Sequence, residues 1–233
     1  MARKNGKEIS GINKKGQVVQ LPDSIIESIL KEGSFANEFV VDGEIIGEVL
    51  HIFDIISLNG DCKKIQPCIG RLNLLGTMKF GPNIEIVKTA YTKEEKQKLY
   101  DELKVRNAEG IVFKKKNSLY TAGRPSSGGS QLKNKFYKEA SFIVKDFTKG
   151  KRSVGLELIN EDGDRVFMGK CTIPPNKDIP EVGSVVEVRY LYAYKGGAVF
   201  QPVFKEQRND VDVEECLMTQ IIYKAGQESD EEE

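Results

Sequence analysis

Short β-rich runs bounded by turn residues recur along the chain and predict a structure built mainly of strands. Phe39–Ile46 and Val49–Ile56 are two such runs separated by Gly47, which predicts a hairpin. Upstream, Glu8–Leu21 predicts a second strand pair around a turn at Asn13–Gly16, where glycine can take a positive φ. The amino-terminal part therefore predicts antiparallel sheet.

Helical spacing of apolar residues is limited to two segments. A short helix is expected within Pro22–Gly33, because proline suits a first turn and glycine an end. Thr92 with Glu95 forms a capping-box pattern that opens a second helix, which we expect to reach about Asn107. Gly110–Lys115 then returns to strand, so the pattern is α+β.

The carboxyl-terminal part consists of closely spaced β-rich runs, with hairpin turn signals at Asp162–Gly163 and Gly196–Gly197. The runs are Ala140–Asp146, Val154–Asn160, Val166–Thr172, Ser184–Tyr194 and Val199–Phe204. Five short strands in about 70 residues fit a small closed barrel of the oligonucleotide-binding (OB) type, with a β-sandwich as the alternative. We predict domains at 1–138 and 139–226, followed by a disordered acidic tail at 227–233.

Charge is balanced overall but not locally. The 233 residues contain 35 Lys and Arg and 35 Asp and Glu, yet 113–152 holds eleven basic residues against two acids. A basic stretch of this kind indicates phosphate contacts, or a solvated lysine-rich face. Asn117–Ser130, rich in glycine and serine, is expected to be a mobile basic loop that closes over an anion.

Composition excludes several classes of protein. No signal peptide begins the sequence, and no apolar run approaches the ~18 residues that span a bilayer. The four cysteines lack paired zinc spacing, so a reduced, cytoplasmic protein with free thiols is expected. His51 is the only histidine and is expected to pack within its strand, which leaves histidine acid–base catalysis almost without candidates.

Carboxylates and lysines occur in a definite order on separate predicted strands. Asp42-Gly43-Glu44 comes first, then His51–Ile56, then Glu109–Lys114, and finally Lys133 and Lys135, which share one face of a strand. This ordered set resembles the motifs of ATP-dependent DNA ligases, which are covalent nucleotidyltransferases, and the resemblance covers nearly the whole chain. It implies an adenylation domain followed by an OB barrel.

The resemblance assigns the catalytic and nucleotide contacts. It implies that Glu44 and Glu109 contact ATP and hold Mg²⁺, a hard cation that prefers carboxylate oxygen. It places Lys133 and Lys135 at the α-phosphate and the ring of Phe53 on adenine. Taken singly, each also fits a structural role: a strand-end acid, an exposed lysine or a core ring.

Lys14 and several basic residues complete the expected site. Lys14 stands where the family has the arginine of a Ser-Arg-x-Gly element, and is expected to touch ribose or phosphate. The last family motif matches only in part, because Phe200 replaces its first arginine and Val211 its final lysine. The basic residues expected to contact DNA are Arg124, Lys151, Arg152 and Arg208.

The family's nucleophile motif, Lys-x-Asp-Gly, does not occur in the sequence, and neither Lys4 nor Lys7 has its context. A trimmed or misplaced start is the favoured explanation, ahead of a nucleophile on a separate chain or a loss of self-adenylation. We expect a monomeric, viral or otherwise minimal ligase that seals nicked duplex DNA. The alternatives are a non-catalytic nick- or end-binding module and an RNA ligase or mRNA capping nucleotidyltransferase.

Overall fold

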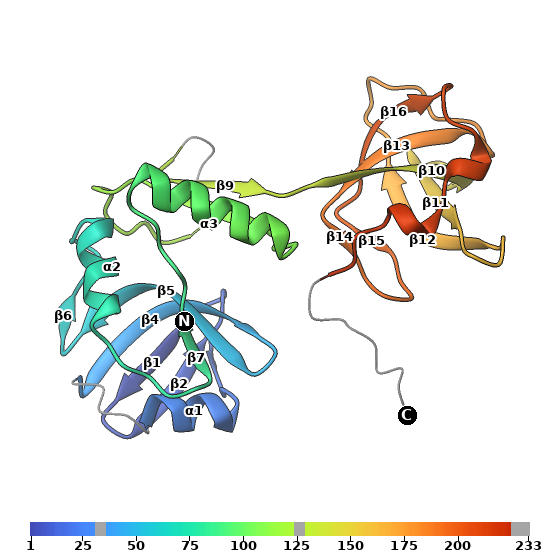
Figure 1. The fold of residues 1–233 in the computed structure, drawn as a ribbon. Coiled ribbons are helices and arrows are strands. Elements are labelled where there is room, and N and C mark those ends of the chain that lie inside the picture. Colours follow the sequence, from blue (N-terminus) through green and yellow to red (C-terminus); the bar gives the residue numbers. More distant parts are fainter. Residues whose placement is uncertain (31–35, 124–128, 225–233) are drawn as a thin grey trace. The chain divides into compact units, whose positions relative to one another are not determined.

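The computed structural model describes residues 1–30, 36–123 and 129–224 (Figure 1). These form two compact units, one of residues 1–91 with 112–132 and the other of residues 92–111 with the chain from 133 onward. The division passes through a hairpin in which β8 (Gly110–Lys114) pairs with β9 (Gln131–Lys135). The predicted domains at 1–138 and 139–226 remain a prediction.

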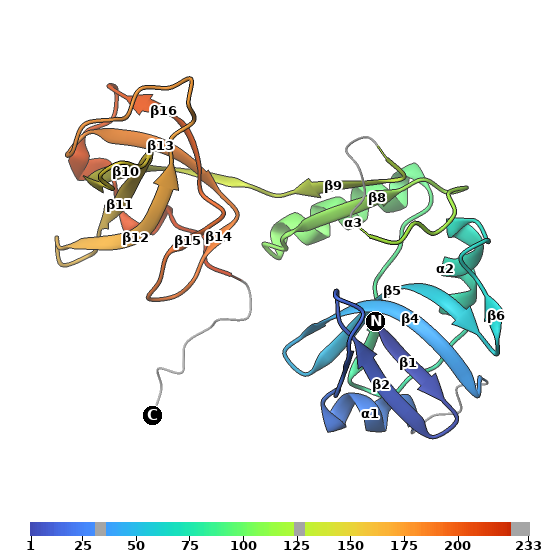
Figure 2. The same cartoon turned by 180° about the vertical axis from the view of Figure 1, so that it is seen from behind.

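The first unit is built on one sheet in the order β3-β2-β1-β4-β5-β6, with β7 pairing in parallel to β5. Its strands are β1 (Ala2–Asn5), β2 (Glu8–Ile12), β3 (Val18–Val19), β4 (Glu38–Ile46), β5 (Val49–Leu58), β6 (Asp61–Cys62) and β7 (Ile84–Ile86). Helix α1 (Asp23–Leu30) lies against this sheet in both views (Figure 2), and α2 (Cys68–Gly76) packs on β5. Ile25, Phe39, Ile52 and Leu75 share one buried core.

Local signals in the first unit are confirmed. The β4–β5 hairpin forms around Gly47 with φ +60°, and the turn between β2 and β3 has Gly16 at φ +80°. Helix α1 begins directly after Pro22, whereas its predicted end at Gly33 lies outside the described residues. The sequence pattern missed α2, which buries Cys68, Arg71 and Leu75.

The second unit contains helix α3 (Lys93–Val105) and a five-stranded antiparallel sheet in the order β12-β11-β10-β13-β16. The sheet strands are β10 (Lys138–Phe147), β11 (Ser153–Ile159), β12 (Arg165–Thr172), β13 (Val185–Tyr190) and β16 (Val203–Arg208). A hairpin of β14 (Tyr192–Ala193) and β15 (Val199–Phe200) and two 3-10 helices, Val213–Glu215 and Met218–Gln220, complete it. The predicted capping box at Thr92 and Glu95 is present.

The predicted closed barrel is not confirmed. Within the described part of the chain, the edge strands β12 and β16 approach each other without pairing, although register shifts bend β10, β11 and β13. Two predicted strands are each divided in two. The run 184–194 is interrupted at Leu191, and the run 199–204 is interrupted at Pro202 and at Gln201, which takes φ +54°. The acidic tail lies outside the described residues. No helix in the described ranges is long and apolar enough to span a membrane.

Candidate functional site

The β4–β5 hairpin carries the first group of candidate residues. Asp42 faces Asp54 across the strands and Glu44 faces His51, with a register shift between Asp42 and Gly43. A Cβ at Gly43 would lie 2.6 Å from the carbonyl oxygen of His51, so a larger residue does not fit there. The glycine between Asp42 and Glu44 is therefore required by the close approach of the two strands.

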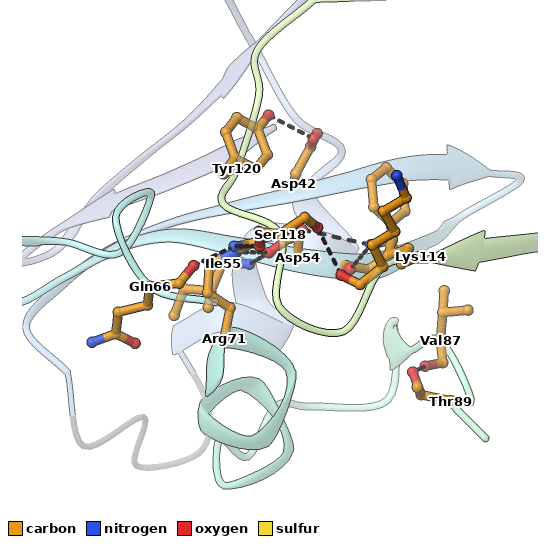
Figure 3. A network of polar contacts seen from close by, with 12 residues as sticks. Asp42, Asp54, Ile55, Gln66, Arg71, Val87, Thr89, Lys114, Ser118 and Tyr120 are labelled. Atoms are coloured by element: carbon orange, nitrogen blue, oxygen red, sulfur yellow. Dashed lines mark hydrogen bonds and ion pairs between the residues drawn. The ribbon is translucent and has the colours of Figure 1, made fainter. Parts of the chain in front are cut away.

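Asp54 is the centre of a buried polar network in this unit (Figure 3). Its carboxylate accepts two hydrogen bonds from Arg71, with Nε–Oδ1 at 2.7 Å and Nη2–Oδ2 at 3.0 Å. Both side chains are 2% exposed, and Lys114 Nζ lies 3.5 Å from the second carboxylate oxygen. A planar fork of this kind fixes the carboxylate in position as well as neutralising it.

Lys114 links this network to the expected adenine-stacking residue. Its Nζ donates to the carbonyl oxygen of Phe53 at 2.8 Å and lies 5.3 Å from the centre of the Phe53 ring. The Tyr120 hydroxyl donates to Asp42 at 3.0 Å. Burial and the neighbouring Asp42 carboxylate raise the pKa of Tyr120 to about 12, so this phenol is a hydrogen-bond donor at neutral pH.

The second unit holds the other candidate catalytic residues. Glu109 and Lys135 form an ion pair at 3.0 Å, and Lys135 also donates to the side-chain oxygen of Gln201 at 3.0 Å. Lys133 lies on the same strand, β9, and is exposed. Gly110 lets this strand approach, since a Cβ there would lie 2.3 Å from the carbonyl oxygen of Asn134. The structure therefore brings Glu109 and Lys135 together.

The other residues expected to contact phosphate or DNA are exposed in some cases and engaged within the fold in others. Lys14 and Lys151 are exposed, and Arg124 lies outside the described residues. The Arg152 guanidinium donates to the carbonyl oxygens of Ile173, Pro174 and Lys177, so it holds a loop of its own unit.

Arg208 is engaged by two carboxylates. It bonds Asp210 through both oxygens, at 2.7 and 2.8 Å, and Glu187 at 3.0 Å. The hydrogen bonds with Asp210 raise the pKa of the arginine and lower that of the aspartate. The DNA contacts expected of Arg208, Arg152 and Lys151 remain predictions.

His51 lies within β5, as expected, and also contacts an acid. Its Nδ1 lies 3.4 Å from Glu85 of the neighbouring strand β7, and its side chain is 27% exposed. No group of three or more His, Cys, Asp or Glu side chains within the described ranges is placed to hold a metal ion. Glu44 and Glu109 are exposed carboxylates of the kind that Mg²⁺ prefers, but they belong to different units, so their shared metal role remains a prediction.

Three residues of the network in Figure 3, Arg71, Lys114 and Tyr120, had no role predicted from the sequence. Lys114 belongs to a recognised motif without a role of its own there, and its contact with Phe53, 61 residues earlier in the chain, is a tertiary property. Arg71 lies 17 residues after Asp54, within a helix that the pattern did not predict. The one available signal was an arginine surrounded by apolar residues, Cys68-Ile69-Gly70-Arg71-Leu72.

Comparison with known proteins identifies the fold. No family model matches the chain, and a search of curated proteins finds no match. Among solved structures, a Lig E DNA ligase described as binding DNA with a minimal scaffold matches with a TM-score of 0.61 at 18% identity. The match covers 89% of this chain and 88% of that one. The chain has the fold of a DNA ligase.

A second solved structure supports the same DNA ligase fold. Pmar-Lig_Pre matches with a TM-score of 0.66 at 18% identity, covering 89% of this chain and 60% of that one. At this level of identity the likeness concerns the fold, and the activity is inferred separately below.

Proposed function

We propose that the protein is an ATP-dependent DNA ligase that seals nicks in duplex DNA as a cytoplasmic monomer. In this reaction an amine attacks the α-phosphorus of ATP and releases pyrophosphate, and the AMP then passes to the 5′-phosphate of the nick. The 3′-hydroxyl finally attacks that phosphorus, forms the phosphodiester bond and releases AMP. Each step moves charge onto phosphate oxygens, which is where fixed cations act.

The candidate residues supply these needs. Lys114 fixes the Phe53 backbone through its carbonyl oxygen and lies 5.3 Å from the ring centre, and the ring is assigned to stack on adenine. Lys133 and Lys135 extend from β9 as cations for the α-phosphate, with Lys135 oriented by Glu109 at 3.0 Å. Lys14, exposed on the β2–β3 turn, is assigned to ribose or phosphate.

Glu44 and Glu109 are assigned to Mg²⁺, because each presents an exposed carboxylate of the kind that this ion prefers. When bound, it would neutralise developing charge on the phosphates. The observation that carries the proposal is the DNA ligase fold over 89% of the chain, with the acid and lysine motifs in the family's order along it.

The nucleophile is the open point, because no Lys-x-Asp-Gly occurs among the 233 residues. Lys4 donates to the carbonyl oxygen of Ala36 at 3.2 Å and lies 6.0 Å from the centre of the Phe39 ring, so it is engaged in the fold. The second candidate is a non-catalytic module that binds nicks or ends on the same fold. Joining of a nick that already carries 5′-adenylate needs no lysine–AMP. A ligase would therefore catalyse this step, and a binding module would not.

The test is a sealing assay on two substrates. Nicked duplex carrying 5′-adenylate is incubated with the protein and Mg²⁺, and ordinary 5′-phosphorylated nicked duplex with the protein, Mg²⁺ and ATP. The proposal predicts joining of the adenylated nick, and a Glu109→Gln variant, which loses the Lys135 ion pair, should join it at least about tenfold more slowly.

A DNA-binding module would hold the duplex but join neither substrate, and that result would refute ligase activity. Replacing ATP by GTP, on a chain extended upstream of Met1, tests the capping nucleotidyltransferase alternative. Transfer of GMP instead of AMP to the protein would favour capping. Replacing the DNA strands by RNA tests the RNA ligase alternative in the same way.

A further inference from the structure

The second unit contains a basic depression that joins Lys135, a candidate for the α-phosphate, to cations from three other elements. It has a volume of about 420 Å³, and its cations are Lys104 of α3, Lys135 of β9, Lys138 of β10 and Arg189 of β13. No aspartate or glutamate lines it. Four cations around one concave surface concentrate a positive potential that favours an anion.

Three of these cations have no carboxylate partner in the described part of the chain. Lys135 is neutralised by Glu109 at 3.0 Å, whereas Lys104, Lys138 and Arg189 form no ion pair there. Glu139 stands opposite Arg189 in the sheet register, but its carboxylate pairs with Lys205 at 3.6 Å. The depression therefore keeps an excess of positive charge.

Aromatic rings hold two of the cations in place. The Arg189 guanidinium lies 4.5 Å from the centre of the Tyr137 ring. Lys104 Nζ lies 4.9 Å from the Tyr100 ring and 5.9 Å from the Phe136 ring. A ring face attracts a cation without cancelling its charge, unlike a carboxylate. These contacts orient the cations and leave their charge available to a ligand.

Arg189 also retains unused hydrogen-bonding capacity. Its Nε is buried and has no acceptor among the described residues. A guanidinium has five donors in a planar fork that matches the oxygens of a phosphate. Lys104 lies over one face of the Tyr100 ring and Arg189 over one face of the Tyr137 ring, so the rings support the cations that line the depression. The chemistry thus indicates a phosphate group.

We propose that this depression binds a phosphate of the DNA backbone, with Arg189 and Lys138 in direct contact and Lys104 contributing charge. The assignment rests on the proposed function, since it names a part of the surface that would hold the duplex. A nucleotide or pyrophosphate carries the same chemical group, and the experiment distinguishes these sources.

The test measures binding of a fluorescein-labelled nicked duplex by anisotropy, at KCl concentrations from about 0.05 to 0.2 M. Arg189→Gln and Lys138→Gln should each weaken binding roughly tenfold. Each should also lower the slope of log affinity against log salt by about one. Lys98→Gln, on the exposed surface of the same helix as Lys104, removes an equal charge outside the depression and should leave affinity within about twofold.

Further variants and a measurement of pyrophosphate binding distinguish the possible sources of the phosphate. Arg189→Lys should retain the salt slope but not the full affinity, and circular dichroism should show all variants folded. If Arg189→Gln and Lys138→Gln bind DNA as Lys98→Gln does, the assignment is wrong, and continued nick sealing would leave the proposed function intact. If they lose pyrophosphate binding but keep DNA binding, the phosphate comes from the nucleotide and the DNA assignment is overturned. Failure of the unaltered chain to bind DNA would remove the proposed function itself.

Discussion

Replacing Arg71 by methionine tests how far the buried network supports the first unit. The substitution leaves the Asp54 carboxylate, with a side chain 2% exposed, with Lys114 at 3.5 Å and the backbone N–H of Ile55 at 2.9 Å as its partners. It also removes the donor to the carbonyl oxygen of Gln66, at 2.6 Å. Breaking one side of a buried ion pair costs about 3–5 kcal/mol, because the remaining charge stays buried. We expect Arg71→Met to lower the free energy of unfolding by that amount.

The assay is urea unfolding followed by far-UV circular dichroism and tyrosine fluorescence, since the chain contains no tryptophan. With a slope of roughly 2 kcal/mol per molar urea, the expected loss moves the midpoint of the first unit's transition down by about 2 M. Asp61→Asn is the matched control, because it removes the partner of Lys63 from a pair in which Asp61 is 81% exposed. Its expected cost is below about 1 kcal/mol.

A double variant separates the charge effect from packing. Asp54→Leu with Arg71→Met removes both members of the pair, and should recover much of the lost stability because no buried carboxylate remains. Lys114 keeps its bond to the Phe53 carbonyl oxygen at 2.8 Å. A loss below about 1 kcal/mol for Arg71→Met, or a double variant less stable than the single one, would refute the reasoning.

Three further predictions concern single positions. Gly43→Ala should destabilise the hairpin by about 1–3 kcal/mol in the same urea assay, since its Cβ would lie 2.6 Å from the His51 carbonyl oxygen; unchanged stability would contradict this. Thr92→Ala should cost about 1 kcal/mol by thermal melting, because α3 loses its capping box. Tyr120 keeps its proton to higher pH when folded, with its pKa raised from 10.0 to about 12. Its contribution is complete below pH 10 and is lost as the pH rises towards 12, so Tyr120→Phe should flatten the fall of stability in that window.

Turns and caps were predictable because their signals are local. Gly16 and Gly47 take the positive φ that their turns require, and Thr92 caps α3 through a residue three positions away. The break in the run 199–204 has one local signal, Pro202, which cannot donate to a strand ladder, but the φ of +54° at Gln201 is uncommon and no neighbouring glycine marks it. It turns one predicted strand into β15 and β16.

In the candidate site too, local features were predictable and long-range contacts were not. The order of acids and lysines along the chain could be read from the sequence, but the side chains that orient them come from distant segments. Lys114 contacts Phe53 from 61 residues away, and Lys135 contacts Gln201 from 66 residues away. Arg189 carried no signal at all, because the basic depression that it lines is built from α3, the β9–β10 segment and β13, which are far apart in the sequence.

The most direct test of the central claim is a crystal structure of the protein with AMP, Mg²⁺ and a nicked duplex. The account predicts adenine on the ring of Phe53 and the α-phosphate about 3 Å from Lys133 or Lys135 Nζ, with Glu44 and Glu109 beside the same nucleotide. A nucleotide bound away from these side chains, or the four charged residues on unrelated surfaces, would contradict it.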